Sequence, residues 1–274
     1  MYGQMQRLES IRGGYVERFT DTESLTMKRA IVIGASSGIG REIAAGLVRR
    51  GWKVGIAARR TELLENLARE FPGAGVEVQT LDITEDGSVQ CLESLIERLG
   101  GMDLFINVSG RGNQNKALEP EVELRTAELN VVGFIRMMDF AFGWFSRNLR
   151  PGGCGQIAAV TSIAGTKGMG TAPAYSATKR MQSTYIDALA QLARMRHISI
   201  DFTDIRPGFV RTDILDSKKT YPMIMDKVPV GEAAVNAILR RRRVVVIDWR
   251  FRILTFFWRL IPQWLWERCT GVTN

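Results

Sequence analysis

Short apolar segments alternate with amphipathic helical segments along most of this chain, and this alternation restricts its fold more than any other feature. From residue 29 onward, apolar runs of four to six residues are separated by stretches with helical periodicity. Strands that are apolar throughout and joined by helices form a parallel sheet with both faces covered. The predicted strands are 30–33, 54–57, 76–80, 104–107, 156–161, 198–203 and 244–247. The predicted helices are 40–50, 61–70, 86–99, 120–148, 173–195 and 231–241.

The 274 residues suffice for one large α/β domain, and no repeat or linker divides them. Residues 27–248 are predicted to form a single-domain, Rossmann-type doubly wound parallel sheet of about seven strands, with helices on both faces. Residues 1–26 have no long apolar run and no clear period, so we interpret them as a mobile N-terminal extension. Residues 249–274 form a C-terminal tail of different composition.

The composition excludes several kinds of site. Cys91, Cys154 and Cys269 are far apart and lack metal-ligand or redox-pair spacing, so they are expected to be free thiols in a reducing, cytoplasmic compartment. The single histidine, His197, precedes a predicted strand. One histidine excludes a catalytic histidine pair, and we expect no metal site.

A glycine-rich turn follows the first predicted strand and opens a helix. Gly34 allows a tight strand-to-helix turn, Gly38 lets a ligand approach the backbone, and Gly40 permits close packing of helix on sheet. A helix N-terminus at this place favours the pyrophosphate of a dinucleotide. The spacing is GxxxGxG rather than the commoner GxGxxG, and a purely structural loop is the alternative. The candidate binding residues of the turn are Gly34, Ser36, Ser37, Gly38, Ile39 and Gly40.

Residues after the second and third predicted strands bear on the choice of cofactor. An acidic residue after the second strand would bind the adenosine ribose and select NAD, but this chain has Arg59 there. Its guanidinium suits the 2′-phosphate of NADP(H). The alternative is that Arg59 and Arg60 are a solvated arginine pair at a helix start. Asp82 and Ile83 follow the third strand, where Asp82 either reaches the adenine or caps the next helix.

Tyr175 and Lys179 are four residues apart, which places a phenol and an ammonium on one face of a helix. A free tyrosine titrates near pH ~10, and a nearby cation lowers that pKa and eases proton exchange at neutral pH. Ser162 follows the fifth predicted strand, where ligands bind in open parallel sheets, and its hydroxyl suits a substrate oxygen.

The ordered set of these motifs resembles the short-chain dehydrogenase/reductase family over residues 28–247. The resemblance implies that Tyr175 is the general acid in ketone reduction, that Lys179 binds the nicotinamide ribose and lowers the tyrosine pKa, and that Ser162 orients the carbonyl. Asn130 would hold a water in a proton relay through Lys179. The resemblance adds to the cofactor-binding residues Asn107, Ser109, Gly110, Tyr175, Lys179, Pro207, Gly208, Val210 and Thr212. The chain departs from the family pattern at two places: Ile33 replaces the usual threonine before Gly34, and Asn107-Val-Ser-Gly110 replaces the usual Asn-Asn-Ala-Gly.

The resemblance also places a substrate lid at about 208–230 and implies a homodimer that pairs through helices 120–148 and 173–195. Apolar residues in the lid suit a hydrophobic substrate, or they simply close over the core. They are Phe209, Ile214, Leu215, Tyr221, Met223, Ile224 and Met225.

The tail carries most of the net charge. The whole chain has a net charge of +8, and residues 240–274 contain eight arginines against Asp248 and Glu267. Because the remaining chain is nearly neutral, we expect no nucleic-acid partner. Residues 249–261 fit a helix with Arg252, Thr255 and Arg259 on one face, and Pro262 suits the start of a second short helix. The residues expected largely opposite that face are Phe251, Leu254, Phe257, Trp258 and Ile261. The apolar run is too short to span a bilayer but suits peripheral contact with an anionic inner membrane surface. Packing on a subunit interface or on the substrate cleft is the alternative.

These observations predict an NADP-dependent oxidoreductase that reduces a lipophilic ketone to a secondary alcohol. The tail resembles that of 3-ketosphinganine reductases and their bacterial relatives, which implies a long-chain 3-keto lipid as substrate. A hydroxysteroid or bile-acid dehydrogenase and a 3-ketoacyl reductase are the alternatives among enzymes. The alternative that is not an enzyme is a non-catalytic, membrane-associated NADP-binding scaffold.

Overall fold

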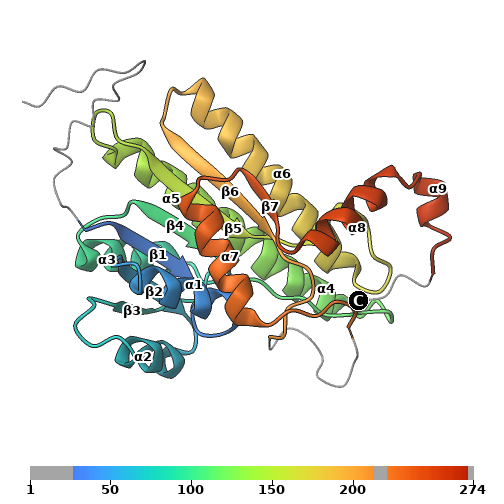
Figure 1. The fold of residues 1–274 in the computed structure, drawn as a ribbon, viewed down its shortest axis with the longest axis horizontal. Coiled ribbons are helices and arrows are strands. Elements are labelled where there is room, and N and C mark those ends of the chain that lie inside the picture. Colours follow the sequence, from blue (N-terminus) through green and yellow to red (C-terminus); the bar gives the residue numbers. More distant parts are fainter. Residues whose placement is uncertain (1–26, 213–220, 271–274) are drawn as a thin grey trace, which may run out of the picture.

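The computed structural model describes residues 27–212 and 221–270, and within them the parallel sheet is the central feature (Figure 1). It has seven strands in the order β3-β2-β1-β4-β5-β6-β7, and every neighbouring pair is parallel. The order reverses between β1 and β4, the arrangement of a doubly wound sheet. The strands are β1 (Arg29–Ile33), β2 (Lys53–Ala58), β3 (Glu77–Thr80), β4 (Leu104–Asn107), β5 (Gly155–Val160), β6 (Ile200–Arg206) and β7 (Val244–Val246).

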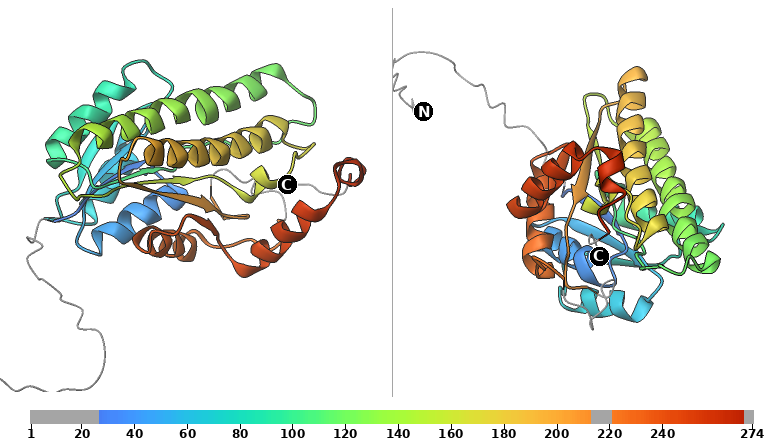
Figure 2. Two further views of the ribbon diagram at one scale, coloured as in Figure 1. Left: turned by 90° about the horizontal axis from the view of Figure 1, so that it is seen from above. Right: turned by 90° about the vertical axis from the view of Figure 1, so that its right-hand side faces the viewer.

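Helices cover both faces of the sheet, as predicted (Figure 2). One face carries α1, α2 and α7, and the other carries α3, α5 and α6. The helices are α1 (Gly38–Val48), α2 (Thr61–Arg69), α3 (Ser88–Leu99), α4 (Pro120–Ala127), α5 (Phe134–Asn148), α6 (Pro173–Met195), α7 (Lys227–Leu239), α8 (Trp249–Leu260) and α9 (Gln263–Trp266).

The continuous apolar strands follow from this two-sided burial. In β1, Ile31 and Ile33 pack with α3 and α5, while Ala30 and Val32 pack with α1 and α7. Successive side chains of a strand point to opposite faces, so a strand covered on both faces needs apolar residues at every position. All four of these residues are fully buried.

The predicted helix 120–148 is interrupted by a π-helical segment, Glu128–Gly133, between α4 and α5. A π-helical turn widens the helix and is frequent at functional sites. Here it contains the buried Asn130, whose side chain forms hydrogen bonds with the backbone of Arg111 in the loop after β4. The interruption therefore coincides with a residue expected in the active site.

The sixth strand runs to Arg206 rather than ending at residue 203 as predicted. The apolar pattern ends early because Asp204 is polar, yet this carboxylate is fully buried. It is neutralised by the Arg206 guanidinium at 2.6 Å and accepts a hydrogen bond from Thr161 at 2.5 Å. At the other end, His197 has a φ of 54° after α6, and the strand begins only at Ile200.

The predicted extension 1–26 and the central part of the predicted lid, 213–220, lie outside the described residues, as do the last four residues of the tail. The two described ends of the lid are joined by a bridge between Val210 and Met225. Phe209 and Tyr221 pack with ring centroids 5.2 Å apart beside this bridge.

The tail forms two helices, α8 and α9, with Pro262 immediately before the second. The predicted polar face is wrong at Thr255, because this residue is 3% exposed and its hydroxyl donates to the Phe251 carbonyl. Such a bond satisfies a buried hydroxyl within its own helix, so threonine is tolerated on the packed face. Phe257, expected opposite the arginines, is 59% exposed. Within the described ranges, no helix is both long and apolar enough to cross a bilayer.

Candidate active site

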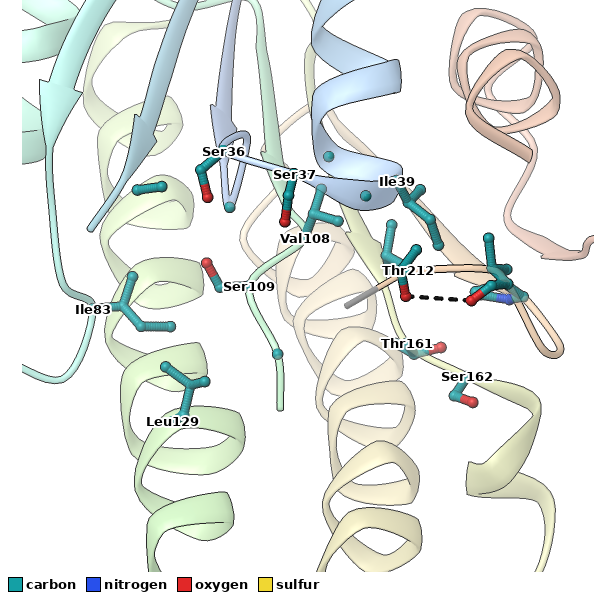
Figure 3. A pocket seen from close by; sticks show the side chains of 18 of the residues that line it. Ser36, Ser37, Ile39, Ile83, Val108, Ser109, Leu129, Thr161, Ser162 and Thr212 are labelled. Atoms are coloured by element: carbon teal, nitrogen blue, oxygen red, sulfur yellow. Dashed lines mark hydrogen bonds between the residues drawn. The ribbon is translucent and has the colours of Figure 1, made fainter. Parts of the chain in front are cut away.

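A cleft of about 360 Å³ opens at the carboxyl ends of the strands, where the strand order reverses (Figure 3). Ligands of open α/β sheets bind at this position. The structure brings nearly all of the sequence-predicted cofactor residues to the cleft wall. They are Gly34, Ser36, Ser37, Gly38, Ile39, Gly40, Arg59, Asp82, Ile83, Ser109, Gly110, Tyr175, Lys179, Pro207, Gly208, Val210 and Thr212.

The glycine-rich turn has the shape that a dinucleotide requires. Gly34 has a φ of +87°, which favours glycine, and its amide donates to the Ala57 carbonyl at 2.7 Å. A Cβ at Gly40 would lie 2.2 Å from the Gly34 carbonyl oxygen, so no larger residue fits there. The N-terminus of α1 follows at Gly38 and faces the cleft. The turn therefore fits the pyrophosphate of a nicotinamide cofactor.

Two arginines line the cleft beside this turn. Arg59, predicted from the sequence, lies 3.7 Å from Asp82, and its side chain is 68% exposed. Arg60, which was not predicted as a cofactor-binding residue, donates to the hydroxyls of Ser37 at 2.6 Å and Ser36 at 3.2 Å. The signal for it was present, because Arg60 also follows the second strand without an intervening acidic residue.

Asp82 caps a turn rather than the next helix. Its carboxylate accepts from the backbone amide of Thr84 at 3.0 Å and from the Thr84 hydroxyl at 2.8 Å, whereas α3 begins only at Ser88. The same carboxylate lines the cleft beside Arg59. Asp82 is thus held rigidly at the cleft wall.

Tyr175, Ser162 and Lys179 meet at the inner end of the cleft. Ser162 follows β5, and its hydroxyl accepts from the Ala164 amide at 3.0 Å. Burial raises the pKa of Tyr175, and a hydrogen bond with Ser162 opposes that rise. Tyr175 and Lys179 come from the first two turns of α6, whose N-terminus Pro173 occupies.

Lys179 is 4% exposed. Burial lowers the pKa of its ammonium to about 8, although the charge of Asp204 opposes this. The Nζ atom donates to the Val160 carbonyl at 3.2 Å and to Gln182 at 3.0 Å. It also lies 5.9 Å from the ring centroid of Tyr175. A buried lysine with a lowered pKa beside a buried phenol is an arrangement that supports proton transfer.

Two predicted residues do not line the cleft. Asn130 is fully buried, and its amide accepts from the Arg111 backbone amide and donates to the Arg111 carbonyl, both at 2.8 Å. Its main-chain carbonyl accepts from Gln182. Asn107 lies at the end of β4, where its side-chain oxygen accepts from the Ser109 amide at 3.1 Å. Both asparagines therefore shape the loop after β4, which forms one wall of the cleft.

The tail packs on the loop that follows Ser162. Lys167 donates to the Ile261 carbonyl at 2.8 Å, and the indole of Trp266 donates to the Gly168 carbonyl at 2.7 Å. Phe251 is fully buried against Gly208 at the base of the lid. The inner face of the tail thus packs beside the active site, where Arg259 and Gln263 line a second cavity that shares Ser162 with the cleft.

A glycine-rich turn at the switch point of a parallel sheet, with a tyrosine, a lysine and a serine at its inner end, defines a nicotinamide-dependent oxidoreductase. Comparison with known proteins agrees, because residues 28–222 match the short chain dehydrogenase family. The chain therefore belongs to this family.

Among similar proteins, an uncharacterized oxidoreductase of Myxococcus xanthus is 30% identical over 89% of this chain and 96% of its own length. A putative ketoacyl reductase of Streptomyces coelicolor is 31% identical over 74% of this chain and 83% of its own length. A solved 3-ketoacyl-(acyl-carrier-protein) reductase from Brucella melitensis, complexed with NADH, superimposes with a TM-score of 0.71 at 24% identity. That superposition covers 82% of this chain and 98% of the other, and it shows a similarity of fold.

Proposed function

We propose that this enzyme uses NADPH to reduce a lipophilic ketone to a secondary alcohol, and that the ketone is a long-chain 3-keto lipid such as 3-ketosphinganine. The observation that carries the proposal is the position of the tail. Its inner face packs on the loop after Ser162, while its outer face exposes large apolar side chains to solvent. A lipid surface bound to the outer face would thus lie next to the loop that holds a catalytic residue.

In the proposed reaction, the cofactor when bound supplies the hydride. Tyr175 donates the phenolic proton to the carbonyl oxygen, and the Ser162 hydroxyl orients that oxygen by a hydrogen bond. The Lys179 ammonium stabilises the resulting phenolate and binds the ribose. Asn130 is connected to Lys179 through Gln182, whose side chain donates to the Asn130 carbonyl and accepts from the Lys179 ammonium.

The outer face of the tail supports peripheral contact with an anionic membrane surface on the cytoplasmic side. Its exposed apolar side chains are Trp249, Ile253, Phe256, Phe257, Leu260, Trp264 and Leu265. Arg252 and Arg259 are also exposed and border this face on the side of the buried Thr255, and Arg268 lies over the Trp264 ring. An apolar face with tryptophans that is bordered by arginines is typical of helices that lie in a membrane interface.

A homodimer through α5 and α6 is part of the proposal. The two helices lie side by side on one face of the sheet (Figure 2), with Tyr185 of α6 hydrogen-bonded to Asp139 of α5. A 3-ketoacyl reductase is the second candidate function, supported by the likeness to the putative ketoacyl reductase of Streptomyces coelicolor.

The choice of NADPH is supported by Arg59 and Arg60. A hydrogen bond to a charged group contributes about 1.5–3 kcal/mol. We therefore expect the double variant Arg59→Asp and Arg60→Asp to lower the preference for NADPH over NADH by about 10- to 100-fold. The ratio of kcat/KM for the two cofactors measures it. Arg69→Asp, an exposed arginine on α2, is the matched control and should leave the ratio unchanged. A ratio that stays constant in the double variant would place both guanidinium groups away from the ribose phosphate.

The function is tested by following NADPH oxidation with 3-ketosphinganine in anionic vesicles, beside a panel of oxo-steroids and a 3-ketoacyl thioester. We expect turnover of the long-chain base to exceed that of the others. The triple variant Phe256→Ser, Phe257→Ser and Leu260→Ser should lose sedimentation with the vesicles and lose turnover of the vesicle-borne ketone at least about tenfold, because each apolar side chain contributes about 1.5–3 kcal/mol on burial.

The control double variant, Leu239→Ser and Val244→Ser, removes exposed apolar side chains of α7 and β7, outside the tail and the proposed dimer helices, and should behave like the parent. Turnover of steroids or of the thioester alone would replace the lipid substrate by one of the alternatives. Equal sedimentation of the parent and the triple variant would leave the tail as a cleft wall without a membrane role.

A further inference from the structure

Lys179 is held by a second residue of its own helix, Gln182, which no motif identifies. Gln182 is three positions beyond Lys179 in α6, and it is fully buried. A buried amide is costly unless both of its ends have partners. Its Oε1 atom accepts from Lys179 Nζ at 3.0 Å, and its Nε2 group donates to the main-chain carbonyl of Asn130 at 2.9 Å.

The chemistry of the two partners determines the orientation of this amide. An ammonium only donates hydrogen bonds, and a main-chain carbonyl only accepts them. A glutamate at this position would direct an acceptor at the Asn130 carbonyl, and an apolar residue would satisfy neither partner. A neutral amide is therefore the side chain that connects Lys179 with Asn130 at this distance.

We propose that Gln182 is a positioning residue for Lys179, whose amide stabilises the ammonium and occupies the path to the Asn130 carbonyl. The family resemblance led us to expect a water in that path. The proposal rests on the proposed function in one respect, namely that Lys179 acts on Tyr175 during catalysis.

The surroundings of Lys179 support a role for this neutral side-chain acceptor. Tyr175 faces it from one turn earlier in α6, and the Val160 carbonyl contacts it from β5. The acidic group that acts on it from β6 is Asp204, which is already paired with Arg206. Because Nζ donates to oxygens of Val160 and Gln182, removing the Gln182 oxygen should destabilise the charged form.

Two substitutions separate this role from simple packing. Gln182→Met fills the same space without a polar group, so the ammonium loses an acceptor. Gln182→Ala leaves a polar space in which one or two waters can bridge Lys179 and Asn130. Positioning therefore predicts that Gln182→Ala is the more active variant, whereas packing predicts that Gln182→Met is, since a cavity is costly. Gln191→Met, an exposed glutamine of α6, is the matched control.

The first readout is the titration of Lys179 in the cofactor-free protein, followed by NMR of the lysine ε-carbon and assigned with Lys179→Arg. We expect the midpoint in Gln182→Met to fall by roughly one pH unit, the size of one hydrogen bond to a charged group. Gln182→Ala should stay near the parent. The pH midpoint of alcohol oxidation should move upward in Gln182→Met, because less ammonium remains to stabilise the Tyr175 phenolate.

An unmoved Lys179 midpoint in Gln182→Met, or higher turnover in Gln182→Met than in Gln182→Ala, would overturn the proposal. The titration needs no substrate. Absence of ketone turnover in the parent protein would thus count against the proposed function alone, while the midpoint would still decide the role of Gln182.

Discussion

The variant Tyr175→Phe is expected to lose about 1000-fold in kcat while binding NADPH as tightly as the parent, because a general acid contributes ~10²–10⁴ to the rate. The substitution removes one hydroxyl and keeps the ring, which packs against the loop after β4. A Cβ at Gly112 would lie 2.9 Å from a ring carbon of Tyr175, so this packing is close. The cleft should therefore keep its shape, and the loss should fall on the chemical step.

Tyr185→Phe is the matched control, since it removes a phenol from the same helix. The Tyr185 hydroxyl donates to Asp139 on α5, and burial together with that carboxylate raises the pKa of Tyr185. It lies outside the cleft, so turnover should be unchanged. Single-turnover NADPH oxidation and a fluorescence titration of NADPH measure the two properties separately. Full turnover in Tyr175→Phe would refute the role of Tyr175 as general acid and would favour the hypothesis of a non-catalytic scaffold.

The fold was predictable from the sequence because the side chains on both faces of the central sheet are apolar. In β1, the four consecutive residues from Ala30 to Ile33 are all apolar, and that pattern distinguishes a sheet covered on both faces from one exposed on a face. The pattern failed where charges are buried in pairs. Asp204 and Arg206 neutralise each other within β6, and a scale that counts each as polar ends the strand too early.

The catalytic candidates could be predicted from their spacing in the sequence, whereas the contacts that hold them in place could not. Tyr175 and Lys179 share a helix face at four residues apart, so the sequence alone indicates that they meet. The contact between Gln182 and Asn130 joins two residues 52 positions apart, and it depends on a widened helical turn that no apolar pattern marks. The buried Thr255 of the tail was missed for a similar reason, because its hydroxyl is satisfied within its own helix.

The variant Lys179→Met should lose turnover by a factor of about 100 or more and yet unfold less readily than the parent at pH 7. The direction of this stability change follows from the pKa of Lys179. Folding lowers the pKa of Lys179 from 10.5 to about 8, so the folded state disfavours the ammonium. Below about pH 8 the buried charge therefore costs stability, and the cost disappears as the pH rises from about 8 to 10.5.

A shift of this size corresponds to about 3 kcal/mol, and the hydrogen bonds to Val160 and Gln182 that the variant loses offset part of it. We expect a net gain of about 1–2 kcal/mol at pH 7 in the free energy of unfolding by urea. The difference between variant and parent should shrink toward pH 10. Lys53→Met, at an exposed lysine of β2, is the control and should show no such pH dependence. A variant that is less stable than the parent at pH 7, with a constant difference up to pH 10, would mean that the Lys179 charge is fully compensated in the fold and that the site holds no destabilising cation before the cofactor binds.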